Sequence, residues 1–548
     1  MLYGDLCKTP AHSHNALTPT TFLERSGRVF PNKAAIIGPM GIITNGALLN
    51  RARCLADLLD SLNVGYGDRV AVLAENSLPI IDVHFSIPAI GAILVMLNPQ
   101  SSLKEIEYLL NFSGSTTLIL DARFSHKICS ESRKNLKILK NIIMFNGVSG
   151  LDNVIIYEKC MDFGVQTNRE LDKIVRDEND ILAINFTSGT TGMPKGVMCT
   201  HRGAYLHSMG QVLMLGLNSS SKYLWTLPMF HVNGWGHIWA NTAISATQII
   251  PSLKTDDEIL QLIDKHSITH FCGAPRLVRK LTQPITENSK LAGLTITTGG
   301  AAPSPSFIQQ LEETGVQFIH QYGLNETYGP YVVCEVQEEW RKMSLASQAN
   351  LLARQGVPTI HAGTGVRVVD KKMQDVPHDG ETLGEVIMKG NTVSVGYYKN
   401  HESTKQVFHR GWFHSGDIAV VHHDGYIEIR DRVKDLIYVE TDYGWENISS
   451  IEIENLISGH EQVSDVAVVG VPSENTTIII AFIEAIGSTQ FIDKELMEIC
   501  EKGLPSHKRP DFFYFTNIPK TSTGKVRKDV LLADAVSLVS RQKKVNGD

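Results

Sequence analysis

The residues with the clearest chemical potential lie at 185–197, where glycines, hydroxyl side chains and one lysine follow one another closely. The apolar run before them, 181–184, predicts a strand that opens into a glycine-rich loop. Glycines let backbone N–H groups turn toward an anion, hydroxyl groups donate further hydrogen bonds, and a lysine adds a point charge. The sequence therefore predicts a loop that binds the phosphates of a triphosphate with Thr187, Ser188, Gly189, Thr190, Thr191, Gly192 and Lys195.

This loop differs from the Walker A loop, in which the lysine is followed directly by serine or threonine. Lys195 lies between Pro194 and Gly196, so the pattern disfavours a P-loop kinase or ATPase. A surface turn made of small polar residues is the alternative interpretation. The concentration of such residues in one short segment favours phosphate binding over a plain turn.

A second stretch, 223–239, is rich in aromatic residues and contains His231. A strand that ends at Pro228 and a glycine-containing loop after it can line an apolar pocket that holds one titratable side chain. A core loop with a hydrogen-bonded histidine would give the same pattern. The residues alone leave both interpretations open.

Two further stretches have the residue types that contact a base and a metal ion. Residues 299–303 read Gly-Gly-Ala-Ala-Pro, and such small side chains let a flat base approach the backbone, although a purely structural turn would look the same. Residues 321–327 contain an aromatic ring, Tyr322, that could stack on a base. They also contain Glu326, whose carboxylate suits a hard cation such as Mg²⁺.

In this order, the stretches resemble the motifs of the AMP-forming adenylating enzymes, the superfamily of acyl-CoA synthetases, luciferases and nonribosomal adenylation domains. The glycine-rich loop is similar to the phosphate-binding loop of that superfamily. Residues 322–326 resemble its Y-G-x-[TS]-E motif, except that Asn325 replaces a phosphate-binding hydroxyl residue and can still donate a hydrogen bond. The superfamily's P-x-F-H-x-x-G pattern is matched by Pro228, Phe230, His231 and Gly234.

The resemblance implies a role for each matching residue. The catalytic residues would be Lys195, His231, Glu326 and Lys525, with Glu326 holding the metal ion. His231 would border the acyl pocket with Val232, Trp235 and Gly300. The nucleotide would be bound by the loop at 187–192 together with Gly300, Ala301, Ala302, Gln321, Tyr322, Gly323, Asn325, Asp417 and Arg432, the last two at the ribose. Lys434 would be the hinge of a small mobile domain.

The elements that must position these residues alternate between strands and helices. Predicted helices at 47–62 and 256–266 and strands at 69–73, 93–97 and 268–271 indicate an α/β fold with mainly parallel sheets. Thr20 and Thr21 are expected to cap a short helix, and the pattern is irregular over 134–180. The resemblance implies a large multi-layer N-terminal domain over residues 1–432, with the ATP and acyl sites. It implies a small mobile α+β lid domain over residues 433–548, opening with strands such as 464–469.

Composition limits the classes of function. The 548 residues exceed one ordinary domain, and the formal net charge of −7 gives no electrostatic reason to expect nucleic acid as a partner. The eight cysteines form no C-x-x-C pair, which argues against a zinc site or a redox dithiol. No apolar run approaches the roughly 18 residues of a membrane span, residues 1–15 lack the apolar core expected of a signal peptide, and the last residues do not match the peroxisomal S-K-L pattern. We expect a cytoplasmic monomer or homodimer.

The resemblance covers nearly the whole chain and is closest to plant-type acyl-activating enzymes, through 204–206 and 326–330. It implies activation of a short- or medium-chain fatty acid with ATP and Mg²⁺ to acyl-AMP. Transfer to CoA would follow, with release of AMP and pyrophosphate. Three alternatives stay open: an adenylating enzyme that loads an aromatic or other acid onto CoA or a carrier protein, a luciferase-like oxygenase, and a nucleotide-binding protein whose lid is impaired in thioester formation.

One segment departs from the superfamily pattern. Its members run from the hinge strand into S-G-G-E-N, whereas 438–445 is longer here and ends in Trp445 where a glycine is usual. The W-G-E motif of the small domain is also absent near 471–476. Bulk at a site where two domains must fit together predicts that thioester formation is slower than adenylation.

Overall fold

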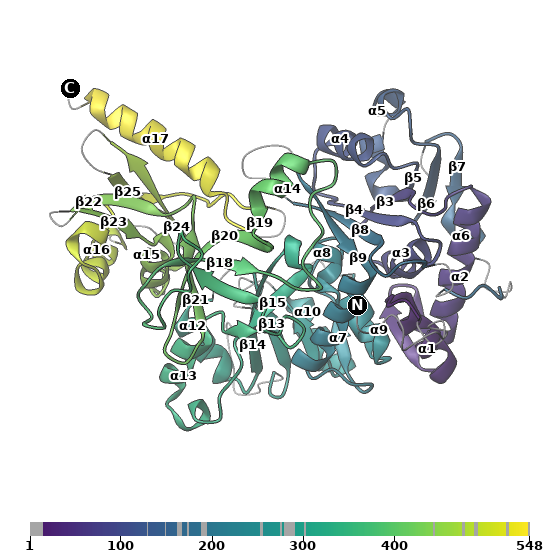
Figure 1. Ribbon diagram of the computed structural model, residues 1–548, viewed down its shortest axis with the longest axis horizontal. Helices are drawn as coiled ribbons and strands as arrows, with labels where there is room; N and C mark the ends of the chain where they lie inside the picture. The colour runs from purple at the N-terminus through teal and green to yellow at the C-terminus, as the bar shows by residue number, and fades with distance from the viewer. Residues whose placement is uncertain are drawn as a thin grey trace, which may run out of the picture.

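The computed structural model describes most of the chain. The described residues are 15–128, 130–147, 150–161, 167–171, 175–187, 194–252, 256–273, 277–278, 291–300, 303–441, 444–473, 477–486, 492–521 and 525–545. Figure 1 shows a large body, coloured purple to green, that joins a smaller body at the yellow, C-terminal end of the chain. We call these bodies the large and the small domain and use the predicted boundary at 432/433.

The N-terminal part of the large domain contains a sheet of seven described strands. In spatial order they are β7 (Val154–Ile156), β6 (Asn141–Phe145), β5 (Thr117–Asp121), β3 (Arg69–Leu73), β4 (Ile93–Leu97), β8 (Ile181–Phe186) and β9 (Gly196–Thr200). Neighbours from β7 to β8 are parallel, and β9 pairs antiparallel with β8 at the edge. Parallel neighbours need crossover connections, and most of the connections in this sheet contain helices.

A second sheet of nine described strands follows. Its order is β16 (Val357–Pro358), β15 (Gly329–Val333), β14 (Gln317–Leu324), β13 (Thr295–Thr298), β12 (His270–Cys272), β10 (Lys222–Leu224), β11 (Thr247–Ile249), β1 (Ala34–Gly38) and β2 (Gly41–Thr44). The strands from β14 to β1 are parallel, and the pairs at both ends are antiparallel.

The main core lies between these two sheets. Side chains of β3 and β4 share one apolar cluster with strands of the second sheet and with α1 (Thr20–Val29), α2 (Asn45–Ser61), α3 (Leu78–Ala89) and α9 (His237–Ala243). Val70 and Val72 point into this cluster, whereas Ala71 and Leu73 join a cluster on the opposite face, under α4 (Leu103–Ser113). Both faces of β3 are therefore buried, which explains the continuous apolar sequence of this strand.

Further helices cover the outer face of the nine-stranded sheet. Its strands share an apolar cluster with α10 (Asp256–His266), α12 (Pro305–Glu312) and α13 (Leu345–Leu352). The large domain also contains the long helix α7 (His201–Met214). Shorter elements complete it: α5 (Ser130–Asn135), α6 (Tyr157–Cys160), α8 (Val232–Trp235), and the 3₁₀ turns η1 (Ala122–Ile128), η2 (Asn325–Thr327) and η3 (Trp340–Lys342).

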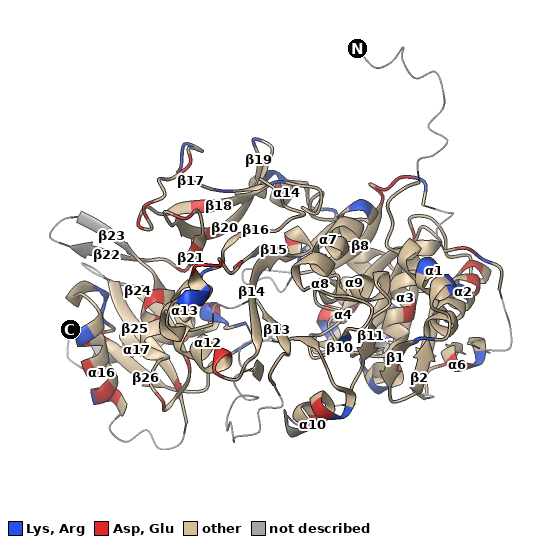
Figure 2. Cartoon of the chain, turned by 90° about the horizontal axis from the view of Figure 1, so that it is seen from below, with Lys and Arg blue, Asp and Glu red and all other residues tan. Residues whose placement is uncertain are grey.

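The last part of the large domain forms an antiparallel sheet of five described strands. Its strands are β17 (Val366–Val369), β18 (Gly384–Met388), β20 (Trp412–Val421), β19 (Phe408–His409) and β21 (Ile427–Arg432), with α14 (His401–Val407) beside it. In Figure 1 this sheet lies between the parallel sheets and the small domain. Figure 2 shows acidic and basic residues interspersed along the chain in that view.

The small domain begins with a hairpin of β22 (Ile437–Thr441) and β23 (Gly444–Ile448). Its sheet consists of β24 (Val463–Pro472), β25 (Thr477–Ala485) and β26 (Phe512–Phe515). Val466 and Val468 face α15 (Ser450–Ile457) and α16 (Ile492–Gly503), whereas Ala467 and Val469 face α17 (Lys528–Val545). The short turn η4 (Ser506–Lys508) precedes β26.

The predicted fold class is confirmed, and several element boundaries are wrong. Thr20 is inside α1, whose first turn has no side-chain cap, and the Thr21 hydroxyl donates to the carbonyl of Thr18. The strand predicted at 268–271 starts only at His270, because Ser267 has a positive φ of 50° that turns the chain after α10. The irregular region over 134–180 contains short edge elements, and the hairpin precedes the strand expected to open the small domain.

Candidate active site

The glycine-rich loop leaves and re-enters the seven-stranded sheet at one edge. β8 and β9 pair antiparallel down to Phe186 and Gly196, so the two ends of the loop lie side by side. The Thr187 N–H donates to the Lys195 carbonyl at 2.9 Å, and the Lys195 N–H donates to Thr187 Oγ1 at 3.3 Å. Ser188, Gly189, Thr190, Thr191 and Gly192 lie outside the described residues. The structure thus closes the base of the predicted phosphate loop and fixes Lys195 there.

Glu326 is brought to the same place by a different part of the chain. It lies in η2, directly after β14, and its Oε1 accepts a hydrogen bond of 2.7 Å from the hydroxyl of Tyr397. The Nζ of Lys195 lies 5.0 Å from the centroid of the Tyr397 ring. Lys195 therefore contacts the ring of Tyr397, and Glu326 contacts the hydroxyl of the same residue. Neighbouring Asn325 is half-buried, and its carbonyl accepts a hydrogen bond from the Tyr328 N–H at 3.1 Å.

A buried carboxylate joins Tyr322 to Arg432. The Tyr322 hydroxyl donates to Asp417 Oδ2 at 2.5 Å, and Arg432 Nε lies 2.8 Å from Asp417 Oδ1. Burial and the carboxylate of Asp417 raise the pKa of Tyr322 well above its usual value, so its ring stays neutral. Asp417 also raises the pKa of Arg432, which keeps its charge. The proposed base-stacking and ribose-binding residues thus form one connected group.

The glycines at the end of β13 leave backbone exposed beside this group. Gly300 has a φ of +83°, a conformation that favours glycine, and a Cβ placed there would meet nothing within 4 Å. A Cβ on Gly299 would lie 2.7 Å from the Gln321 carbonyl and 2.8 Å from the Trp235 ring, so only glycine fits there. Ala301 and Ala302 lie outside the described residues.

The remaining β14 residues are held by the protein itself. The buried side chain of Gln321 points toward α7, where its Nε2 lies 3.3 Å from Gln211 Oε1. Gly323 pairs with Pro330 of β15. A role of Gln321 toward a nucleotide would therefore fall to its backbone, whereas the Gln321 side chain contacts the core.

The loop with His231 has an unusual backbone. Consecutive φ values from Val232 to Gly236 are all positive, between 40° and 70°, although Val232, Asn233 and Trp235 are not glycines. Left-handed conformations are costly for such residues and persist only where the surroundings fix them. Here buried contacts fix the turn: Asn233 Nδ2 lies 3.3 Å from His84 Nε2, and Trp235 packs on Gly299. The turn thus aims Trp235 at the glycines near the proposed adenine site.

The imidazole of His231 is neutral at pH 7. The side chain is half-buried, yet the protein packed around it lowers its pKa to about 4, and the charge of Lys525 adds to this shift. A neutral imidazole suits the wall of an apolar pocket. The effect of the Lys525 charge places this residue of the small domain close to His231.

Lys525 is presented at the end of a tight loop. The Thr521 N–H donates to the Lys525 carbonyl at 2.7 Å, and the Lys525 N–H donates to Thr521 Oγ1 at 3.1 Å. Although water reaches Lys525, surrounding protein partly desolvates the ammonium and, together with Arg432, lowers its pKa to about 8. Asp417, Lys434 and Asp435 also act on this charge. Predicted residues of both domains therefore meet here.

Lys434 lies at the turn between β21 and β22. The N–H groups of Asp435 and Leu436 both donate to the Arg432 carbonyl, which forms a tight turn with Lys434 exposed inside it. One turn is thus the direct link between the sheet of the large domain and the first strand of the small domain. The hinge role of Lys434 remains a prediction.

A network beside this turn was missed by the sequence interpretation. Asp431, buried at the end of β21, accepts hydrogen bonds from the Ser450 N–H at 2.7 Å and the Ser450 hydroxyl at 2.6 Å. Lys528 Nζ hydrogen-bonds to the same hydroxyl and lies 2.7 Å from Glu454 Oε1. These bonds tie the large domain to α15 and α17. Nothing in the spacing of Asp431, Ser450 and Lys528 along the sequence predicts their meeting.

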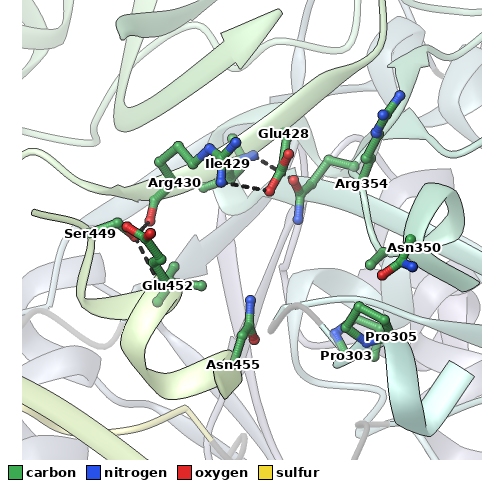
Figure 3. A pocket seen from close by; sticks show the side chains of 13 residues that line it. Pro303, Pro305, Asn350, Arg354, Glu428, Ile429, Arg430, Ser449, Glu452 and Asn455 are labelled. Carbon is green, nitrogen blue, oxygen red and sulfur yellow. Dashed lines mark hydrogen bonds and ion pairs between the residues drawn. The ribbon is translucent and has the colours of Figure 1, made fainter. Parts of the chain in front are cut away.

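A cavity of about 150 Å³ lies between the domains, where Arg430 and Ser449, the chain neighbours of Asp431 and Ser450, form part of its wall (Figure 3). Pro303, Pro305 and Asn350 line one side, and Ser449 and Asn455 line the other. The charged groups at its wall are paired: Arg430 with Glu428 at 3.0 Å and Arg354 with Asp424 at 3.0 Å. The cavity follows from the arrangement of the two domains and contains none of the predicted catalytic residues.

The carboxylate of Glu326 suits a magnesium ion whose other ligands are substrate phosphates and water. Within the described residues, no group of three His, Cys, Asp or Glu side chains could hold a metal ion, and Glu326 Oε2 has no hydrogen-bond partner there. Mg²⁺ commonly binds through one or two carboxylates and substrate phosphates and keeps several waters. A single free carboxylate oxygen opposite a phosphate loop suits this mode.

Comparison with known proteins agrees with the geometry. A family model described as AMP-binding enzyme matches residues 23–398, and one described as AMP-binding enzyme C-terminal domain matches residues 452–525. The chain is 37% identical to an acetate–CoA ligase of Humulus lupulus, over 98% of each chain. It is 36% identical to a 4-hydroxybutyrate–CoA ligase of Metallosphaera sedula, over 97% of this chain and 96% of that one.

Solved structures show the same fold. An anthranilate CoA ligase in complex with anthranoyl-AMP superposes with a TM-score of 0.82 at 23% identity, over 96% of this chain and 99% of that one. A benzoate CoA ligase from Burkholderia xenovorans gives a TM-score of 0.80 at 20% identity, over 94% and 99%. Taken with the sequence matches, these findings show that the chain belongs to the AMP-binding enzyme family, among its AMP-forming acyl-CoA synthetases.

Proposed function

We propose that this acyl-CoA synthetase activates a small aliphatic carboxylic acid. As a member of its family it uses ATP and Mg²⁺ to form acyl-AMP and transfers the acyl group to CoA. The observation that carries the choice of acid is the packing of Trp235 on Gly299, next to the bare backbone of Gly300. An acyl chain extending from this point would soon meet the indole ring.

Further aromatic residues lie near Trp235. A Cβ on Gly234 would lie 2.9 Å from the Trp225 ring. The rings of Trp239 and Tyr328 are stacked at a centroid distance of 5.8 Å, and both residues are buried. These side chains leave little depth for a long chain or a second ring. The names of the acetate and 4-hydroxybutyrate ligases among its relatives agree with a small acid.

The residues of the site support the chemistry of the first half-reaction. A carboxylic acid is ionised at pH 7, so it needs no general base before it attacks the α-phosphorus. Lys195 at the base of the phosphate loop is placed to bind the leaving pyrophosphate. Lys525, near His231, Asp417 and Arg432, is placed to stabilise charge between the carboxylate and the α-phosphate. Magnesium bound at Glu326 would neutralise phosphate charge.

The second half-reaction requires that Lys525 leave the site so that the CoA thiol can reach the acyl-AMP. The turn at Lys434 and the few hydrogen bonds around Asp431 support a rotation there. We therefore also propose that the domains are 1–432 and 433–548.

A chain-length series tests the choice of acid. Acetate, butyrate, hexanoate, octanoate, benzoate and cinnamate are each offered with ATP, Mg²⁺ and CoA, and AMP and thioester are measured. We expect kcat/KM to be highest for acids of two to about five carbons. Trp235→Ala should shift the optimum to longer acids, by about fourfold per methylene group that gains contact.

Trp340→Ala is the matched control, because Trp340 is also buried but packs against Tyr426. It should lower stability without changing the order of preferred acids. A wild-type optimum with octanoate or cinnamate, or an unchanged preference in Trp235→Ala, would exclude the proposed pocket.

Location and assembly are separate proposals. No described helix is long and apolar enough to cross a membrane. We keep the cytoplasm as the proposed compartment and a monomer or homodimer as the proposed assembly. The trans-cinnamate:CoA ligase of Petunia hybrida, 36% identical over 93% of each chain, is described as peroxisomal. Imaging of the tagged protein, with the tag placed internally, distinguishes the two compartments.

A further inference from the structure

A segment outside the named strands connects the two halves of the nucleotide site. Residues 394–398 run antiparallel to β9, with the Met198 N–H donating to the Gly396 carbonyl at 3.1 Å and the Tyr398 N–H donating to the Gly196 carbonyl at 2.7 Å. On its other side, the Ser394 N–H donates to the Glu326 carbonyl at 2.7 Å. This backbone therefore fixes η2, which carries Glu326, against the strand that follows the phosphate loop.

Tyr397 is the residue of this segment that points into the site. It is 6% exposed, its hydroxyl donates to Glu326 Oε1 at 2.7 Å, and its ring centroid lies 5.0 Å from Lys195 Nζ. One side chain thus contacts both the carboxylate proposed for magnesium and the lysine proposed for phosphate.

We propose that Tyr397 is a positioning residue that holds Glu326 and Lys195 apart and aims each at its own part of the magnesium–nucleotide complex. The hydroxyl occupies one carboxylate oxygen of Glu326 and leaves Oε2 for the metal ion. The ring gives the Lys195 ammonium a contact that does not neutralise Glu326.

This arrangement avoids an ion pair between Lys195 and Glu326, which would have to be broken when phosphate and metal bind. A lysine and a glutamate facing one another across a partly buried site would pair, and that pair would compete with phosphate and metal. A hydrogen bond to a carboxylate and a cation–π contact orient both groups while their charges remain available. Residues that orient a metal ligand typically change metal affinity by 10- to 100-fold when they are removed.

Tyr397→Phe tests the hydroxyl, because it keeps the ring over Lys195 and deletes only the bond to Glu326. The readout is Mn²⁺ binding, followed by electron paramagnetic resonance in the presence of α,β-methylene-ATP, which cannot form an adenylate. We expect Mn²⁺ affinity to fall about tenfold. Metal-free binding of the analogue should change by less than about twofold, since Lys195 keeps its contact.

Tyr398→Phe is the matched control. Tyr398 is the next residue in the same segment, and its hydroxyl donates to the Ser113 carbonyl at 3.3 Å, away from Glu326. This variant should have wild-type Mn²⁺ affinity. Tyr397→Leu, which also removes the ring, should additionally weaken metal-free binding of the analogue.

The inference depends on the proposed metal-binding role of Glu326, and Glu326→Gln separates the two. If Glu326→Gln leaves Mn²⁺ binding unchanged, the role of Glu326 is wrong. If Glu326→Gln weakens Mn²⁺ binding but Tyr397→Phe and Tyr398→Phe have the same Mn²⁺ affinity, Tyr397 is not a positioning residue. We expect the double variant to bind Mn²⁺ no more weakly than Glu326→Gln alone, because the hydroxyl acts through that carboxylate.

Discussion

Raising the pH from 7 to 9 should slow acyl-AMP formation about tenfold, because Lys525 loses its proton over this range. Desolvation and the nearby charge of Arg432 lower the pKa of Lys525 to about 8. With that value, the charged fraction falls from about nine tenths at pH 7 to about one tenth at pH 9. Only the ammonium form can stabilise the negative charge that builds up between carboxylate and α-phosphate. The first half-reaction is therefore favoured below pH 8 and lost above it.

The assay is pyrophosphate–ATP exchange without CoA, measured as kcat/KM for ATP, which reports groups of the free enzyme. Lys525→Arg is the control, because a guanidinium keeps its charge throughout this range. This variant should be slower and its rate should not fall between pH 7 and 9. The reaction of supplied acyl-AMP with CoA should also not fall, because Lys525 acts only in the first transition state. A tenfold fall that persists in Lys525→Arg, or a flat profile in the wild type, would refute the assignment.

Four further perturbations test individual parts of the site and of the fold. Glu326→Gln should raise the Mg²⁺ concentration needed for half-maximal adenylation at least tenfold and leave the KM for the acid within about twofold; an unchanged Mg²⁺ titration would argue against a metal role. Asp431→Asn should slow adenylation more than transfer of the acyl group from supplied acyl-AMP to CoA. The reason is that hydrogen bonds to the Asp431 carboxylate, worth about 1.5–3 kcal/mol each, hold the small domain with Lys525 in the site. Equal losses of both rates in single-turnover assays would contradict this prediction. Replacing 438–445 with Ser-Gly-Gly should raise thioester formation and not adenylation, and wild-type thioester formation as fast as adenylation in a single turnover would eliminate this idea. Tyr157→Phe should lower the free energy of unfolding in urea by about 1–3 kcal/mol without changing the preferred acid, because it removes the hydroxyl that bonds to buried Asp82 and Arg51. An unchanged midpoint of urea unfolding would show that this hydroxyl contributes nothing to stability.

Sequence alone could predict the parts of the fold that depend on local pattern. The continuous apolar strand β3 was predicted from its length and flanking turns, and α10 was predicted to the residue at 256–266. Predicted strand and helix boundaries were wrong where the backbone conformation of a single residue determines the boundary. Ser267 has a positive φ without being glycine or asparagine, so nothing in its type predicts that the next strand starts later.

The candidate site could be predicted only one motif at a time. Lys195 and Glu326 were each singled out by their surroundings in the sequence, but their contacts with the same tyrosine depend on residues 394–398 pairing with β9 and η2. That pairing is long-range, and no periodicity encodes it. Tyr397 was therefore missed, although it contacts both.

The loop at His231 shows a different limit. The sequence interpretation left open whether this histidine lies in a core or borders a pocket. The choice depends on a left-handed turn through Val232 and Trp235, residues that rarely adopt it, and on a lysine from the other domain. Packing against His84 and Gly299 stabilises that turn, and such packing cannot be deduced from residue types.

The hairpin at 437–448 differs from what the sequence suggested. The departing segment was expected to add bulk at a domain edge, and the structure instead extends β22 and β23 by regular pairing, with Glu440 opposite Trp445 and Thr441 opposite Gly444. Residues 442 and 443 lie outside the described part of the chain. The effect of this longer hairpin on CoA transfer is still a prediction.

The central claim is that one site adenylates a small aliphatic acid and then forms its CoA thioester. Its most direct test is to incubate the purified protein with ATP, Mg²⁺, CoA and butyrate and to quantify nucleotides and thioester together by mass spectrometry. We expect AMP, pyrophosphate and butyryl-CoA in equal amounts, and no butyryl-CoA when any component is omitted. Formation of ADP, or AMP that accumulates without any thioester, would contradict it.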